Sequence, residues 1–91
     1  MYEVLAGVRS TSSDDGGIVL DINLGQMFRL NPVGAFILDQ LQKGHSEAKI
    51  SEDIARRYDI DEEMAATDVR TFLKELEEYK LVRTQPGERI S

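Results

Sequence analysis

The chain has 91 residues, a formal net charge of −6 and no cysteine. This length suits one domain, and the acidic balance disfavours non-specific binding to nucleic acid or to an anionic membrane, because like charges repel. The absence of cysteine excludes disulfides, thiolate nucleophiles and cysteine metal sites, and the single histidine, His45, excludes a histidine cluster.

The first part of the chain has the alternating pattern of β-strands. Val4, Ala6 and Val8 alternate with other residues, which predicts a first strand. Residues 10–17 are polar and rich in turn-forming residues, so we expect a flexible loop there. Residues 18–22 alternate again and predict a second strand.

A third strand is predicted over residues 26–30. The three residues 23–25 join it to the second strand as a hairpin loop, in which Gly25 supplies the left-handed conformation. Its side chains alternate between two faces. We assign Phe28 and Leu30 to the inner face, and Met27 and Arg29 to the outer face.

Three helices are predicted in the rest of the chain, each with a recognisable start. Asn31 can cap the first helix and Pro32 suits its first position, while Gly44 suits its end. Ser46 can cap the second helix. Asp61 can cap the third, which we extend to Lys80, a favourable cation in its last turn. The apolar stripes are Val33, Phe36, Ile37 and Leu41; Ile50, Ile54 and Tyr58; and Ala65, Val69, Phe72, Leu73 and Leu76.

This order of elements predicts an α+β fold of the winged helix-turn-helix type, with a three-stranded antiparallel sheet followed by three helices. One domain is expected over residues 1–84, with Leu81 and Val82 packed back on the core, and a flexible tail over residues 85–91. No apolar run is long enough for a membrane span and no signal-peptide pattern is visible, so we expect a cytoplasmic protein. We also expect a monomer, although a free edge strand allows two copies to pair.

Catalytic, metal and cofactor sites have little support. We expect His45 to be an exposed turn residue between two helices. Residues 14–17 lack the spaced ligands of a calcium loop, and the glycines lack phosphate-loop spacing. The expectation is therefore a protein that is not an enzyme and that holds no metal or cofactor.

DNA binding is one alternative for a winged helix. The third helix would enter the groove, yet residues 61–80 carry seven acidic side chains against three basic ones, a net charge of −4. The charge of this helix therefore argues against DNA.

Peptide binding agrees better with the pattern. The third strand ends the strand series, so if sheet order follows chain order, one of its edges is free to pair with an extended peptide. By helical geometry Asp68, Phe72, Glu75 and Tyr79 share one flank of the third helix. That flank combines aromatic area with negative charge, which suits a peptide with apolar anchors and a basic residue.

Two stretches of the sequence resemble the PqqD-like family. Residues 17–38 contain a hairpin, an apolar–aromatic pair, Leu-Asn and a glycine in the following helix start. An Asp-Val pair at Asp68 and Val69 then precedes a Phe-Leu-xx-Leu helix and the final pair Leu81-Val82. The resemblance covers residues 4 to 82, and one departure is Lys80, where many members carry glycine.

The resemblance implies a non-catalytic RiPP recognition element, which binds the leader of a ribosomally made precursor peptide. The leader would add as a strand beside the third strand, pack on the third helix, and be presented to a separate processing enzyme. The lasso-peptide type, with its leader peptidase, is favoured over the quinone-cofactor type, with its radical-SAM enzyme. A third possibility is a small subunit of a larger enzyme that uses the same edge strand. The implied peptide-binding residues are Met27, Phe28, Arg29, Leu30, Asp68, Val69, Phe72 and Leu73.

Overall fold

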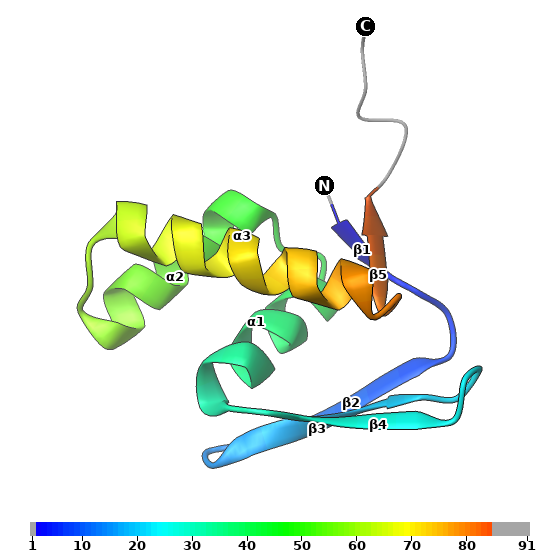
Figure 1. The fold of residues 1–91 in the computed structure, drawn as a ribbon. Coiled ribbons are helices and arrows are strands. Elements are labelled where there is room, and N and C mark those ends of the chain that lie inside the picture. Colours follow the sequence, from blue (N-terminus) through cyan, green and yellow to red (C-terminus); the bar gives the residue numbers. More distant parts are fainter. Residues whose placement is uncertain (1, 85–91) are drawn as a thin grey trace, which may run out of the picture.

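The computed structural model describes residues 2–84 and contains five strands and three helices. Three helices lie on one side of a three-stranded sheet, and a separate two-stranded sheet lies beside them (Figure 1). The strands are β1 (Tyr2–Val4), β2 (Val8–Ser13), β3 (Gly16–Asp21), β4 (Gln26–Leu30) and β5 (Val82–Thr84). The helices are α1 (Pro32–Gln42), α2 (Glu47–Tyr58) and α3 (Glu62–Glu78). The predicted α+β class is confirmed. The predicted tail, residues 85–91, lies outside the described residues.

The larger sheet has the order β2-β3-β4, antiparallel throughout. The flexible loop predicted over residues 10–17 is wrong, because β2 runs to Ser13 and β3 begins at Gly16. Ser13 pairs with Gly16, so only Asp14 and Asp15 form the turn. Whether a segment forms a strand depends on the strand that it pairs with. Residues 10–13 have the composition of a loop, but they form part of β2 because they pair with β3.

The first strand was predicted across Val4, Ala6 and Val8, and the structure divides this segment. Tyr2–Val4 forms β1, whereas Val8 begins β2 after a turn at Gly7, whose φ is +87°. β1 pairs with β5 at the far end of the described chain, with Val4 opposite Val82. Sequence patterning missed β5, since three residues carry no periodic signal and the pairing joins segments far apart in the chain.

The turn between β3 and β4 has four residues, not three. β3 ends at Asp21, which is 3% exposed and whose carboxylate accepts the N–H groups of Asn23 and Leu24 at 3.0 and 3.3 Å. The N–H of Gly25 donates to the carbonyl of Asp21 at 2.8 Å. The buried carboxylate therefore ends the strand one residue before the alternation predicts.

The predicted helix starts are confirmed at all three positions. Asn31 accepts the N–H of Gly34 at 2.8 Å, and Ser46 accepts that of Lys49 at 3.1 Å. Asp61 occupies the cap position of α3, but its side chain makes no capping hydrogen bond. Lys80 is not in the last turn of α3. It follows the helix with a left-handed φ of +63°, the conformation usually left to glycine.

The core lies between the helices and the inner face of the three-stranded sheet. α2 packs against α3, and α1 packs against β2 and β3. Leu81 and Val82 are each 1% exposed, which confirms that they pack on the core. The largest fully buried side chains are Ile37, Leu38, Ile50, Ile54, Leu73, Leu81, Val19, Val69 and Val82.

Candidate functional site

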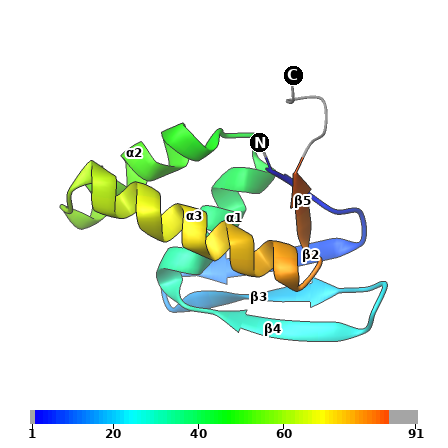
Figure 2. The same cartoon turned by 45° about the horizontal axis from the view of Figure 1, so that its top comes forward.

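The outer edge of β4 is the first feature of the candidate site. Among residues 2–84, β4 pairs with β3 on one side only, and Figure 2 shows it at the margin of the sheet with α3 above it. Sheet order does follow chain order within this sheet, so the edge expected from the sequence is present. A free edge presents unpaired backbone N–H and C=O groups that another extended chain can bind.

The register identifies which backbone groups face that edge. The N–H of Ile22 donates to the carbonyl of Gly7 at 2.9 Å, so Ile22 and every second residue before it turn their backbone groups toward β2. The intervening residues of β3 face β4. Three residues of β4 thereby have their backbone groups on the β3 side: Gln26, Phe28 and Leu30. Met27 and Arg29 present their N–H and C=O groups on the free edge.

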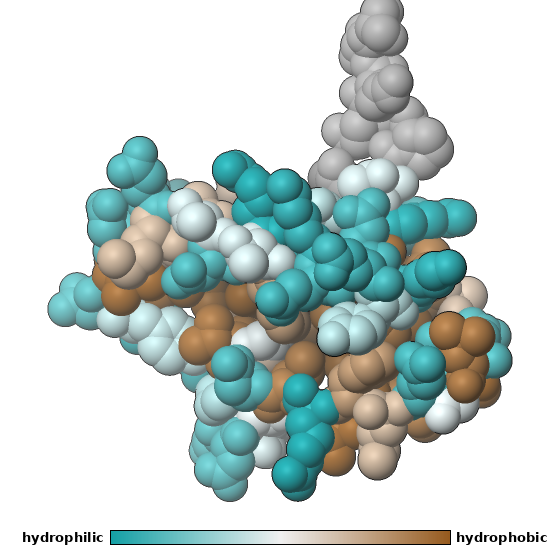
Figure 3. All heavy atoms as spheres, in the orientation of Figure 1, coloured by the Kyte–Doolittle hydropathy of each residue, from teal (hydrophilic) through white to brown (hydrophobic). Residues whose placement is uncertain are grey.

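A hollow of about 310 Å³ lies between β4 and α3. Its apolar part comes from both elements: Phe28 and Leu30 point from the strand toward the helix, and Phe72 and Tyr79 project from α3. The rings of Phe28 and Tyr79 lie 4.9 Å apart between centroids and 47° from parallel, a stable tilted pair. Figure 3 shows apolar side chains between α3 and the sheet, bordered by hydrophilic ones.

A second hollow, of about 360 Å³, continues the first along α3 past Phe72 and the start of α1. Asp68 and Glu75 bring carboxylates to it. Gly34 lies against Phe72, and a Cβ at this position would approach the ring to 3.0 Å. Glycine in the first turn of α1 thus leaves room for Phe72 between the two hollows. We name the two hollows together the β4–α3 groove.

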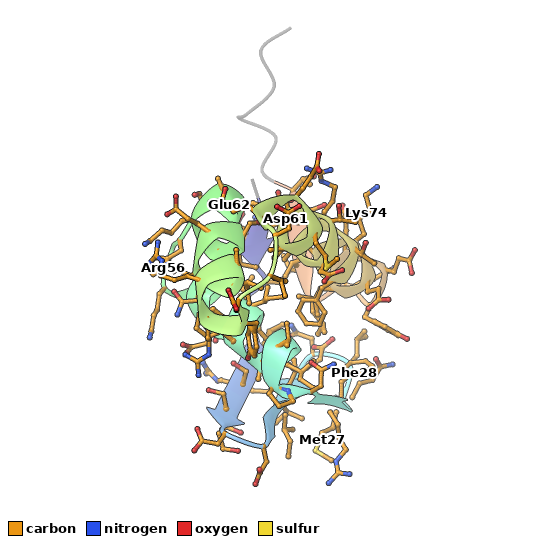
Figure 4. All side chains as sticks on the ribbon, turned by 90° about the vertical axis from the view of Figure 1, so that its left-hand side faces the viewer. Met27, Phe28, Arg56, Asp61, Glu62 and Lys74 are labelled. Atoms are coloured by element: carbon orange, nitrogen blue, oxygen red, sulfur yellow. The ribbon has the colours of Figure 1, made fainter. Side chains whose placement is uncertain are left out.

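The structure divides the eight implied binding residues into three groups. Phe28, Leu30, Asp68 and Phe72 line the groove. Met27 and Arg29 supply the backbone of the free edge, and Figure 4 shows Met27 pointing away from the helices while Phe28 points toward α3. Val69 and Leu73 are each 0% exposed, so they support the groove from within the core and present no surface to a ligand.

The flank predicted from helical geometry is present as a surface. Asp68, Phe72, Glu75 and Tyr79 all border the groove. Sequence reasoning missed Thr71 of α3, and it also missed the contributions of Asn31, Val33, Gly34 and Leu81. Asn31, Val33, Gly34 and Leu81 lie outside α3 and meet it only in the folded chain, so the spacing within α3 does not indicate them.

The charge around the groove is mainly negative. Asp68 and Glu75 lie on its helix side, whereas Arg29 borders its strand side but turns its side chain to the opposite side of the sheet. Within residues 2–84, neither of these two carboxylates takes part in an ion pair of the protein itself. Both are therefore available to a basic group of a ligand.

Two further features of the described residues concern metals and membranes. No group of three metal-ligating side chains comes together among residues 2–84. In the same part of the chain, no helix combines the length and apolar character needed to cross a membrane.

Comparison with known proteins gives one family and two solved structures. Residues 16–82 match the family model described as coenzyme PQQ synthesis protein D (PqqD). The fold is similar to that of "TbiB1 in Complex with the TbiA(beta) Leader Peptide", with 28% identity, a TM-score of 0.84, and coverage of 91% of this chain and 96% of that one. It is also similar to "Lasso peptide synthetase B1 complexed with the leader peptide", with 23% identity, a TM-score of 0.81, and coverage of 91% and 98%. No curated protein matches the sequence.

Proposed function

The chain belongs to the PqqD family, and from this premise we propose that it is a non-catalytic protein that binds the leader of a ribosomally made precursor peptide. The leader adds as a strand to the free edge of β4 and lays alternate side chains into the β4–α3 groove. The bound precursor is then presented to a separate processing enzyme in the cytoplasm.

The observation that carries this proposal is the coincidence of a free strand edge and a groove on the same strand. An added strand gains affinity through main-chain hydrogen bonds and specificity through pockets for every second side chain. β4 offers both, since the backbone of Met27 and Arg29 faces the edge while Phe28 and Leu30 face the groove. The similar TbiB1 structure holds a leader peptide, which supports a ligand of this class.

The favoured enzyme partner is a lasso-peptide leader peptidase. Support comes from the description of the second similar structure as a lasso peptide synthetase B1 with a leader peptide. A second candidate is a peptide chaperone for a radical-SAM enzyme in quinone-cofactor maturation, which the description of the matching family model favours. One experiment distinguishes the two candidates. The purified chain is mixed with the precursor encoded beside its gene and with one enzyme at a time, and the turnover of each enzyme is measured with and without the chain. The partner is the enzyme whose turnover the chain increases.

The decisive test removes one backbone donor from the free edge. Met27→Pro deletes an N–H that faces the edge, and proline is tolerated at such positions. We expect leader affinity, measured by calorimetry with the synthetic leader, to fall about fivefold or more, since one hydrogen bond contributes roughly 0.5–1.5 kcal/mol and the ring also obstructs the incoming strand.

Met27→Ala is the matched control, because it removes the same side chain and keeps the N–H. We expect it to retain leader affinity within about twofold, whereas Phe72→Ala should lose about tenfold through the groove itself. Equal affinities of Met27→Pro and Met27→Ala would contradict strand addition at β4. Absence of any binding by the wild-type chain would contradict the proposed function as a whole.

A further inference from the structure

The side of the three-stranded sheet that faces away from the helices is exposed and apolar. The register places Leu20 beside Met27 and Ile18 beside Arg29, with all four side chains on this side. Ile18 and Leu20 are each 40% exposed and Met27 is 68% exposed. We name this surface the outer sheet face; the side chains that form it are Arg9, Thr11, Ile18, Leu20, Met27 and Arg29, continued by Ile22 and Leu24 in the following turn.

No element of residues 2–84 covers the outer sheet face. All three helices and the smaller sheet lie on the opposite side (Figure 1). The apolar character extends to the turn between β3 and β4, where Ile22 and Leu24 are 54% and 58% exposed, and Figure 3 shows apolar side chains gathered at that end of the sheet. A contiguous apolar surface of this kind marks an interaction site more often than isolated exposed residues do.

The charge on this face is opposite to that of the molecule. The whole chain carries −6, yet the outward positions hold Arg9 and Arg29 and no carboxylate. No ion pair among residues 2–84 includes either arginine. Complementarity therefore requires an occupant with an apolar centre and carboxylates at its margin.

Charge also argues against two other occupants. A second copy of the chain would bring four guanidinium groups and no carboxylate into one interface. An anionic membrane would attract the two arginines but repel a chain whose net charge is −6. A protein partner can confine its carboxylates to a patch that faces the two arginines, so it complements this surface without opposing the net charge of the whole chain.

We propose that the outer sheet face docks the processing enzyme, through an acidic and apolar patch on that enzyme. This inference rests on the proposed function. The β4–α3 groove lies on the other side of the same sheet, so peptide and enzyme bind without competing. A leader strand added beside β4 extends the sheet by one strand, and its alternate side chains continue the outer sheet face next to Met27 and Arg29. The enzyme therefore contacts protein and bound leader together, and it binds the loaded chain more tightly than the empty one.

The experiment measures enzyme and leader binding separately for three variants. Arg9→Glu and Leu20→Thr change the outer sheet face at positions outside the groove and the free edge. Lys74→Glu is a matched charge reversal on α3, on the side away from the sheet (Figure 4). The probes are the leader peptidase and the synthetic leader encoded beside this gene, with the affinity of each measured by biolayer interferometry and folding checked by circular dichroism.

We expect Arg9→Glu and Leu20→Thr to weaken peptidase docking by about tenfold or more and to leave leader affinity within about twofold, whereas Lys74→Glu changes neither. Wild-type chain should bind the peptidase several-fold more tightly when loaded with leader. Unchanged docking in both face variants overturns the inference. The inference is also overturned if the wild-type chain forms a dimer in sedimentation and Leu20→Thr abolishes that dimer. Binding to phosphatidylglycerol vesicles that Leu20→Thr abolishes would overturn it as well. Loss of leader binding by the wild type contradicts the proposed function instead.

Discussion

Leu73→Ala tests whether this residue belongs to the core or to the binding surface. Leu73 is 0% exposed, so truncation removes buried methyl groups and leaves a cavity. Such changes cost about 3 kcal/mol, within a range of roughly 2–5. A domain of this size has a free energy of unfolding of roughly 5–14 kcal/mol, at about 0.05–0.15 kcal/mol per residue. The variant therefore folds, but with a large part of its stability lost.

Urea denaturation followed by circular dichroism measures this loss, since the chain has no tryptophan for fluorescence. With an m-value of about 1.5 kcal/mol/M, the midpoint should fall by about 2 M. Leu73→Met keeps the volume and should cost less than about 1.5 kcal/mol. Leader affinity of the folded Leu73→Ala variant should equal that of the wild type. An unchanged midpoint together with weakened leader binding would refute the assignment of Leu73 to the core.

Two further predictions concern helix ends. Lys80→Gly should raise the free energy of unfolding by roughly 0.5–1 kcal/mol, because the left-handed φ of +63° strains a residue with a Cβ, and Lys80→Ala should give no such gain in the same urea assay. Asn31→Ala should lower the free energy of unfolding by about 1 kcal/mol, because its side chain caps α1. Asp61→Ala should cost less, since that side chain makes no capping bond, and equal losses for the two would count against the observed difference in capping.

The sequence by itself determined the local elements that have their own signals. Asn31, Pro32 and Ser46 mark helix starts through groups that act within a few residues. β4 and the stripe of α3 follow from strict alternation and from helical spacing, and the flank that borders the groove follows from that spacing as well. The acidity of α3 already argued against DNA. All these features depend on neighbours along the chain, which is why they can be read before the fold is known.

Only the tertiary structure decided the features that depend on distant partners. β2 is a strand because β3 pairs with its serines and its threonine, and β1 is a strand because the chain returns at Val82 to pair with it. Phe72, Val69 and Leu73 share one apolar stripe, yet Phe72 borders the groove while Val69 and Leu73 are buried in the core. The difference arises because the positions of α1 and the sheet determine which part of the stripe meets solvent. The outward exposure of Leu20 on β3 likewise follows from all helices packing on one side of the sheet, whereas Met27 on β4 was already assigned to the outer face from the sequence. Burial is a property of the assembled layers, and alternation along one strand gives two faces without saying which of them will be covered.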